Sequence, residues 1–296
     1  MRRIPRYLQA LAERYVVRHL RRSLDPAESQ AAVLGVLNAL PGRFEAITRE
    51  GDARTARMNR QLAWSMAFVA GAVNAGGFLA VGRYTSHMTG VVSSIADGAA
   101  QGDFAAALSF LAMMLCFMGG AALSTVLVAY GKRHHLRSRY ALSLLAEAGL
   151  LLAFGYLGAR LDAKVHLDLP EATALLCFIM GMHNAVTTNI SGAVVRTTHM
   201  TGNVTDLGIE LAKLFYRNSP KLRGAPPIRA DRARLKLVGL LLASFVAGGV
   251  LGALGFHRFG FKATVPLAAF LVLLAARPLI LELRLLFRHL RRDLES

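Results

Sequence analysis

Six long runs of apolar residues constrain this chain more than any other feature of its sequence. A helix needs about 20 mostly apolar residues to cross the hydrocarbon core of a bilayer. Runs of this kind cover residues 62–82, 104–130, 140–159, 172–195, 237–256 and 263–281. The chain is 54% hydrophobic and only 18% charged, which is unusual for a soluble domain. We therefore expect an all-α integral membrane protein with six transmembrane helices.

The basic residues between these runs predict how the helices are oriented. Loops rich in Lys and Arg stay in the cytoplasm, because their translocation is disfavoured. Such residues precede the first run, join the second to the third and the fourth to the fifth, and follow the sixth. The remaining connections carry few basic residues. Both termini are therefore expected in the cytoplasm.

The N-terminal region differs in composition from the rest of the chain. The formal net charge of +17 indicates an anionic partner, and residues 1–22 alternate Arg with apolar residues as in a basic amphipathic helix. We expect this helix to lie on anionic membrane lipid. A solvated tail that only enforces topology is the alternative, and no nucleic-acid partner is expected because no recognition motif accompanies the charge. The chain thus divides into a basic cytoplasmic extension, residues 1–60, and a transmembrane domain, residues 61–296.

The transmembrane domain contains an internal repeat. Residues 68–75 align with 178–185, sharing Phe, Gly, Asn and Ala at the same spacing, and the HMTG box of residues 87–90 returns at 199–202. The Gly-Gly pairs at 119–120 and 248–249 are a third match. The repeats cover about residues 61–160 and 171–285, and each holds three apolar runs. An odd number of crossings starts the second copy from the opposite side, so we expect inverted repeats.

These boxes resemble those of a known family. Gly71-x-x-Asn74 with His87–Gly90, and Gly181–Ala185 with Arg196–Asn203, are similar to motifs of the YoaK-like family of small bacterial multi-pass membrane proteins, a domain of unknown function. The resemblance covers about residues 61–285. It implies a multi-pass helical bundle in a bacterial inner membrane and names no activity.

Small and polar residues precede each HMTG box, at 74–77 and 187–192. Non-helical backbone persists at membrane depth only where protein or water satisfies its amides, so we expect broken or re-entrant segments that line a cavity. Thr89 and Thr201 are expected N-caps of the helices that follow. The free amides and positive dipole end of such helices favour an anion.

A polar site at the membrane midplane follows from these boxes, binding a small polar or anionic solute. The predicted site residues are Asn74, His87, Thr89, Gly90, His183, Asn184, His199, Thr201 and Gly202. The alternative is that Gly and Thr mediate close helix packing while His and Asn form interhelical hydrogen bonds without a ligand. A soft-metal transporter using the histidines and nearby methionines is a minor alternative. We expect no cofactor and assign no metal site.

Two formal charges lie well inside the apolar runs, Glu147 and Arg277. Ionisable residues within membrane helices are candidates for function. The two lie at similar depths, which predicts an intramembrane charge pair across the repeats. In the alternative interpretation, Arg277 extends to the cytoplasmic headgroups.

The sequence contains no GxSxG, HExxH or phosphate-loop motif, so we do not expect an enzyme. We expect a transporter or permease-like protein. The competing class is a membrane scaffold or regulator whose basic N-terminus is the active part. The Gly-Gly pairs also permit close contact between chains, so a homo-oligomer is among the expected partners.

Overall fold

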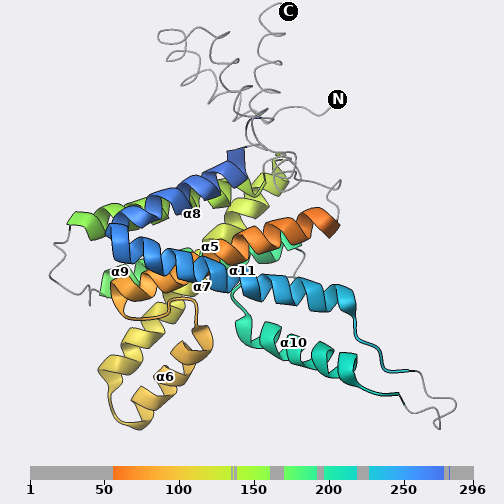
Figure 1. Cartoon of the computed structure of the whole chain (residues 1–296). Helices are drawn as coiled ribbons and strands as arrows, with labels where there is room; N and C mark the ends of the chain where they lie inside the picture. Colours follow the sequence, from red (N-terminus) through yellow and green to blue (C-terminus); the bar gives the residue numbers. More distant parts are fainter. Residues whose placement is uncertain are drawn as a thin grey trace, which may run out of the picture.

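The computed structural model describes residues 56–134, 136, 139–160, 170–191, 197–218, 227–276 and 280. This part is all-helical and contains no strand (Figure 1). Its helices are α5 Ala56–Val81, α6 Met88–Ala100, α7 Phe104–Arg133, α8 Ala141–Arg160, α9 Pro170–Ser191, α10 Met200–Phe215 and α11 Arg232–Phe259. The 3-10 turn η2, Gly260–Ala263, then leads into a helix over residues 264–276. The expected all-α class is confirmed, whereas the predicted amphipathic helix over residues 1–22 lies outside the described residues.

Apart from the end residues Gly82 and Tyr140, every predicted apolar run is helical where the structure describes it. Four helical stretches there are long and apolar enough to cross a membrane: Arg60–Val81, Phe104–Arg133, Ala141–Ala159 and Arg232–Ala276. The last contains α11, η2 and the helix over residues 264–276, which correspond to two predicted runs. The run at 172–195 became α9, whose polar residues keep it outside this group. The helices indicate a membrane protein, and the number of crossings stays a prediction.

The helices α5 and α9 continue through small and polar residues where we expected a break. Residues 74–77 belong to α5, and 187–191 belong to α9. A Cβ atom at Gly76 would lie 2.3 Å from Phe256 Cδ2, so this glycine makes room for a side chain of α11. The prediction of a broken helix at these residues was wrong, because Gly76 serves packing between helices, and Thr187, Thr188 and Asn189 donate to carbonyl oxygens one turn earlier within α9.

The first helix ends at a glycine in the left-handed region. Gly82 has a φ of 69°, and its N–H donates to the carbonyl oxygen of Phe78 at 2.7 Å. This conformation is a common helix end and favours glycine. The chain therefore leaves α5 just before the first HMTG box.

Two helix pairs join the halves of the chain: α5 packs along α11, and α7 packs along α9. A Cβ at Gly71 would lie 2.0 Å from the carbonyl oxygen of Phe245, and one at Gly248 would lie 2.0 Å from that of Phe68. The second pair repeats this arrangement. There, a Cβ at Gly181 would lie 2.0 Å from the oxygen of Phe117, and one at Gly120 would lie 1.9 Å from that of Phe178. The sequence repeat thus corresponds to two equivalent backbone contacts, each between helices from different halves.

Each box helix pairs with the long helix that follows it, α6 with α7 and α10 with α11, and both box helices lie in the lower half of Figure 1. Asp103 caps α7 by accepting from the backbone N–H of Ala106 at 2.9 Å. Asp231 caps α11 by accepting from the N–H groups of Ala233 and Arg234 at 2.9 and 3.0 Å. The two caps extend the repeat to the turns between the paired helices.

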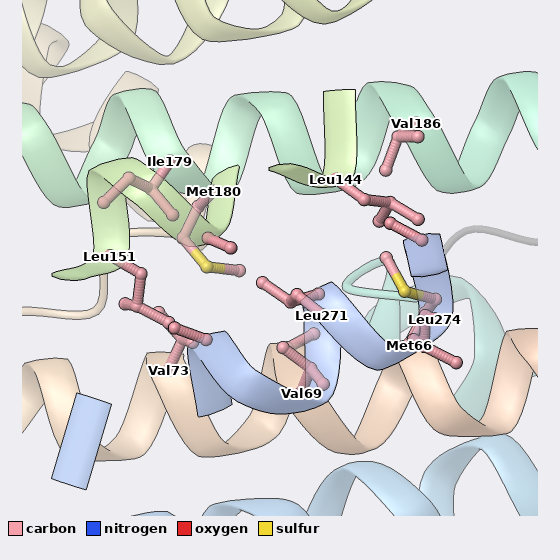
Figure 2. Close-up of a cluster of buried hydrophobic side chains, with 14 of the residues drawn as sticks. Met66, Val69, Val73, Leu144, Leu151, Ile179, Met180, Val186, Leu271 and Leu274 are labelled. Atoms are coloured by element: carbon pink, nitrogen blue, oxygen red, sulfur yellow. The ribbon is translucent and has the colours of Figure 1, made fainter. Parts of the chain in front are cut away.

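The main core lies where α5, α8, α9 and the helix over residues 264–276 meet. Figure 2 shows apolar side chains of these four helices pointing toward one another: Met66, Val69, Val73, Leu144, Leu151, Ile179, Met180, Val186, Leu271 and Leu274. All of them are buried. The core thus combines helices of both repeats.

Candidate functional site

Each HMTG box begins a short helix with histidine, and not threonine, at the N-cap. The carbonyl oxygen of His87 accepts from the N–H of Val91, and that of His199 accepts from Asn203, both at 3.1 Å. Neither histidine side chain makes a capping hydrogen bond. Thr89 and Thr201 are each the second residue of their helix, and both are exposed. The prediction of threonine caps was therefore wrong, because the first helical hydrogen bond is accepted by the histidine backbone.

The glycine of each box makes room for the histidine ring of the same box. A Cβ atom at Gly90 would lie 2.3 Å from His87 Cδ2, and one at Gly202 would lie 2.6 Å from His199 Cε1. Both histidines are nevertheless exposed. Each box thus presents an imidazole over the first turn of its helix.

An asparagine of the preceding helix anchors the loop before each box. Asn74 Oδ1 accepts from the hydroxyl of Ser86 at 2.8 Å and from its backbone N–H at 3.3 Å. In the second repeat, the hydroxyl of Thr198 donates to Asn184 Oδ1. The Nδ2 of Asn184 donates to the carbonyl oxygen of Met180 at 3.0 Å. Both asparagine carbonyl groups therefore hold the residue that precedes the box histidine.

A buried threonine lies two residues before each histidine. Thr85 is 0% exposed, and its Oγ1 has no hydrogen-bond partner within the part of the chain that the structure describes. Thr197 is also 0% exposed, with its Oγ1 3.5 Å from that of Thr187. We did not single out these threonines, although their place in the repeated boxes was a usable signal.

His183 takes part in a separate interaction, in the core. Its Nδ1 lies 2.7 Å from Glu147 Oε1, and its Nε2 lies 3.0 Å from the carbonyl oxygen of Met66. Both side chains are 1% exposed. Arg277, the partner that we predicted for Glu147, lies outside the described residues. The sequence analysis placed both residues inside apolar runs but gave them different partners, and it missed that Glu147 and His183 pair with each other.

The described contacts therefore divide the predicted site residues into three groups. One box contains Asn74, His87, Thr89 and Gly90, the other contains Asn184, His199, Thr201 and Gly202, and His183 pairs with Glu147. Among the described residues no hydrogen bond joins one box to the other, or His183 to either box. No group of three or more His, Cys, Asp or Glu side chains that could hold a metal ion occurs in this part of the chain.

Comparison with known proteins gives a family without an activity. The family model described as "Protein of unknown function (DUF1275)" matches residues 62–277, and the chain belongs to this family. The match is consistent with the resemblance to the YoaK-like family. No curated protein and no solved structure matches the chain.

Proposed function

We propose that this member of the DUF1275 family is a transporter or permease that binds a small polar or anionic solute at its two HMTG boxes. The proposal depends above all on the repeated construction of the boxes. In each, an exposed histidine lies against the glycine of the first turn of a helix, and within the described residues the side chain of this N-cap histidine makes no capping hydrogen bond. Such duplicated polar sites in an apolar helical chain are typical of transporters.

The chemistry of each box suits a ligand with acceptor oxygens. The first amide groups of a helix have no partner within the helix, and they lie at its positive dipole end. An imidazole adds a donor whose charge changes near neutral pH. In the first box, the buried hydroxyl of Thr85, which has no hydrogen-bond partner among the residues that the structure describes, adds another polar group two residues before His87. These groups favour a small anion or a polar solute.

The arrangement of the helices supports movement between two halves. We propose that α5, α7, α8, α9, α11 and the helix that begins at residue 264 cross a bacterial inner membrane as two inverted three-helix repeats. The short helices α6 and α10 would be re-entrant. The two glycine contacts, α5 with α11 and α7 with α9, each join helices from different repeats (we call them the glycine crossings). The halves therefore meet along close backbone contacts. Relative motion at these contacts would expose the boxes alternately to the two sides.

A scaffold without transport activity is the second candidate. Two observations support it. The side-chain carbonyl groups of Asn74 and Asn184 accept hydrogen bonds within the chain, and the box histidine rings pack against glycine. These contacts are also expected of boxes that only stabilise the fold. In that case the basic N-terminal residues would carry the function.

The test compares the purified full-length protein with the double variant His87→Ala/His199→Ala. Its control is His257→Ala, which removes an exposed histidine from the last turn of α11. Thermal unfolding is measured with small anions, amino acids, nucleobases, sugars and Cu(I). A ligand at 100 times its Kd stabilises the folded state by about 2.7 kcal/mol. We expect one solute class to raise the melting temperature of the wild type and the control only, and liposomes containing the protein to accumulate a labelled member of it.

The opposite result has a clear meaning. If no solute acts and the double variant is merely less stable, the boxes are packing elements and the scaffold function replaces the transporter. Stabilisation by Cu(I) alone would favour the soft-metal alternative.

A further inference from the structure

The core holds a carboxylate–imidazole pair that the box sites do not use. Glu147 lies on α8 between Leu144 and Leu151, and His183 lies on α9 between Met180 and Val186. Figure 2 shows these four apolar neighbours inside the buried cluster. We propose that Glu147 and His183 form a proton-binding site that takes up a second proton when an anionic solute binds. This proposal rests on the transporter function above.

The hydrogen bonds determine how many protons the pair holds. The carbonyl oxygen of Met66 can only accept, so His183 Nε2, at 3.0 Å from it, must carry a hydrogen. The 2.7 Å separation between Nδ1 and Glu147 Oε1 then requires one more proton between these two atoms. That proton belongs either to an imidazolium beside a carboxylate or to a carboxylic acid beside a neutral imidazole. The net charge of the pair is zero in both arrangements.

A second proton has a defined place to bind. Glu147 Oε2 is buried and has no hydrogen-bond partner among the described residues. Protonation of Oε2 gives a neutral carboxylic acid while Nδ1–H still donates to Oε1 and Nε2–H still donates to Met66. The proton comes from water, no other bond changes, and the charge of the pair rises from zero to +1.

A buried positive charge is unfavourable unless an opposite charge compensates it. Anion binding would therefore favour uptake of the second proton. Because such coupling is reciprocal, protonation of the pair would favour anion binding to the same extent. In this proposal the proton is the coupling ion and an anion is the solute class.

The helices around the pair supply no competing charge in their described parts. On α5 the charged residues are Arg57 and Arg60, near its start; on α9 Glu171 lies near the start; and on α8 Arg160 is the last residue. The helix over residues 264–276 has no ionisable side chain. Tyr156 of α8 is exposed, and Cys177 of α9 packs toward Met113 and Val91. In this part of the core the proton balance thus depends on Glu147 and His183.

Infrared difference spectroscopy on the full-length protein in liposomes tests the proposal. Spectra are compared between about pH 8 and about pH 5, a range that includes the titration of an ordinary imidazole. We expect the pH difference spectrum to contain the C=O stretch of a protonated carboxylic acid, which shifts in heavy water. This band is new at the lower pH if the pair starts as imidazolium and carboxylate, and it changes frequency there if the pair starts as carboxylic acid and neutral imidazole. The band should be lost in Glu147→Gln and kept in Glu171→Gln, which neutralises an exposed acid at the start of α9. In His183→Gln it should be present at both pH values, because an isolated carboxyl group in an apolar site stays neutral.

Sodium sulfate serves as the probe anion in a second set of spectra. We expect the band of the wild type to appear at higher pH with sulfate than without it. Absence of the band, or its persistence in Glu147→Gln, would overturn the proton site; the wild-type spectra decide this even if a variant fails to fold. A band that responds to pH but not to sulfate would overturn the coupling to anions. If the variant His87→Ala/His199→Ala does not change solute binding, the proposed transporter function, with its solute site at the boxes, is refuted. The proton site of Glu147 and His183 is not affected by that result.

Discussion

At the scale of single residues, the box histidines and glycines depend on each other. His87 and His199 keep their ring positions because Gly90 and Gly202 carry no side chain. The histidines are exposed, so their rings can move when space is lost. The effect of a larger residue should therefore appear in solute binding more than in stability.

We predict that Gly90→Ala and Gly202→Ala abolish solute-dependent stabilisation while changing the free energy of unfolding by less than about 1 kcal/mol. The added Cβ displaces the imidazole, and alanine partly compensates through its higher helix propensity. Thermal unfolding with and without the solute measures both effects. Gly149→Ala is the control, because a Cβ there meets nothing within 4 Å. A full solute response in both box variants would contradict the proposed role of the rings.

The buried pair gives a second prediction at this scale. His183→Leu should lower the free energy of unfolding by about 1–3 kcal/mol, because it leaves the Glu147 carboxyl group buried without its hydrogen-bond partner. The double variant Glu147→Leu/His183→Leu should recover most of this loss, since an apolar pair suits the surrounding core. Chemical unfolding in detergent measures both. A double variant as unstable as the single one would mean that the loss comes from packing and not from the unpaired carboxyl group.

At the scale of helices, the glycine crossings decide which helices meet. Small residues let two backbones approach within van der Waals distance, which is a main source of helix association in lipid. The equivalent contacts at Gly71 and Gly181 join α5 to α11 and α9 to α7. A side chain at either position meets backbone, which cannot move aside as a side chain can.

We predict that Gly71→Val and Gly181→Val each destabilise the fold by about 3 kcal/mol, the upper end of the usual cost of overpacking. The two values should be similar, because a Cβ added at either position would lie 2.0 Å from a carbonyl oxygen of the facing helix. Thermal unfolding of each variant is the measurement, with Gly149→Val as a control for the valine itself. A large effect at one position only would show that the crossings are not energetically equivalent.

The junction of α10 and α11 should respond to acid. Lys213 donates to Glu210 Oε1 at 2.8 Å, and the N–H of Asp231 donates to Oε2 at 2.7 Å. Both hydrogen bonds lower the pKa of Glu210 below its ordinary value of 4.5, and the bond from Lys213 has the larger effect. The stabilisation is therefore complete above pH 4.5 and is lost as the pH falls through the lower, folded-state pKa. The protection of the Asp231 amide from hydrogen exchange, relative to its intrinsic rate, should fall over that range in the wild type. In Glu210→Gln, whose side chain does not take up this proton, the protection should not change in this way.

At the scale of the whole molecule, the distribution of charge predicts the topology. The sequence from the end of α7 to the start of α8 carries Lys132, Arg133, Arg137 and Arg139, whereas the turn at the end of α11 carries only Arg258 and Lys262. The loop after α7 should therefore lie in the cytoplasm together with both termini, and the turn after α11 should lie outside.

Cysteine labelling tests this topology in a background without Cys116 and Cys177. A membrane-impermeant maleimide should label Arg258→Cys in intact spheroplasts, and it should label Lys132→Cys only after permeabilisation. Both positions are exposed in the structure, so burial in the protein does not limit the reaction. The reverse labelling pattern would refute the predicted orientation.

Hydropathy and residue spacing predict where the apolar helices lie and that the chain contains an internal repeat. These are local properties, because they are read along the chain without knowing which helix faces which. The packing of helices against one another explains why α5 stays helical through Gly76 and Gly77, since Phe256 and Leu176, which need this space, lie on other helices. The same holds for Glu147 and His183, which are 36 residues apart, and for His183 and Met66, which are 117 apart. Such contacts depend on how each helix is rotated and packed, and the spacing of residues within one helix does not specify this.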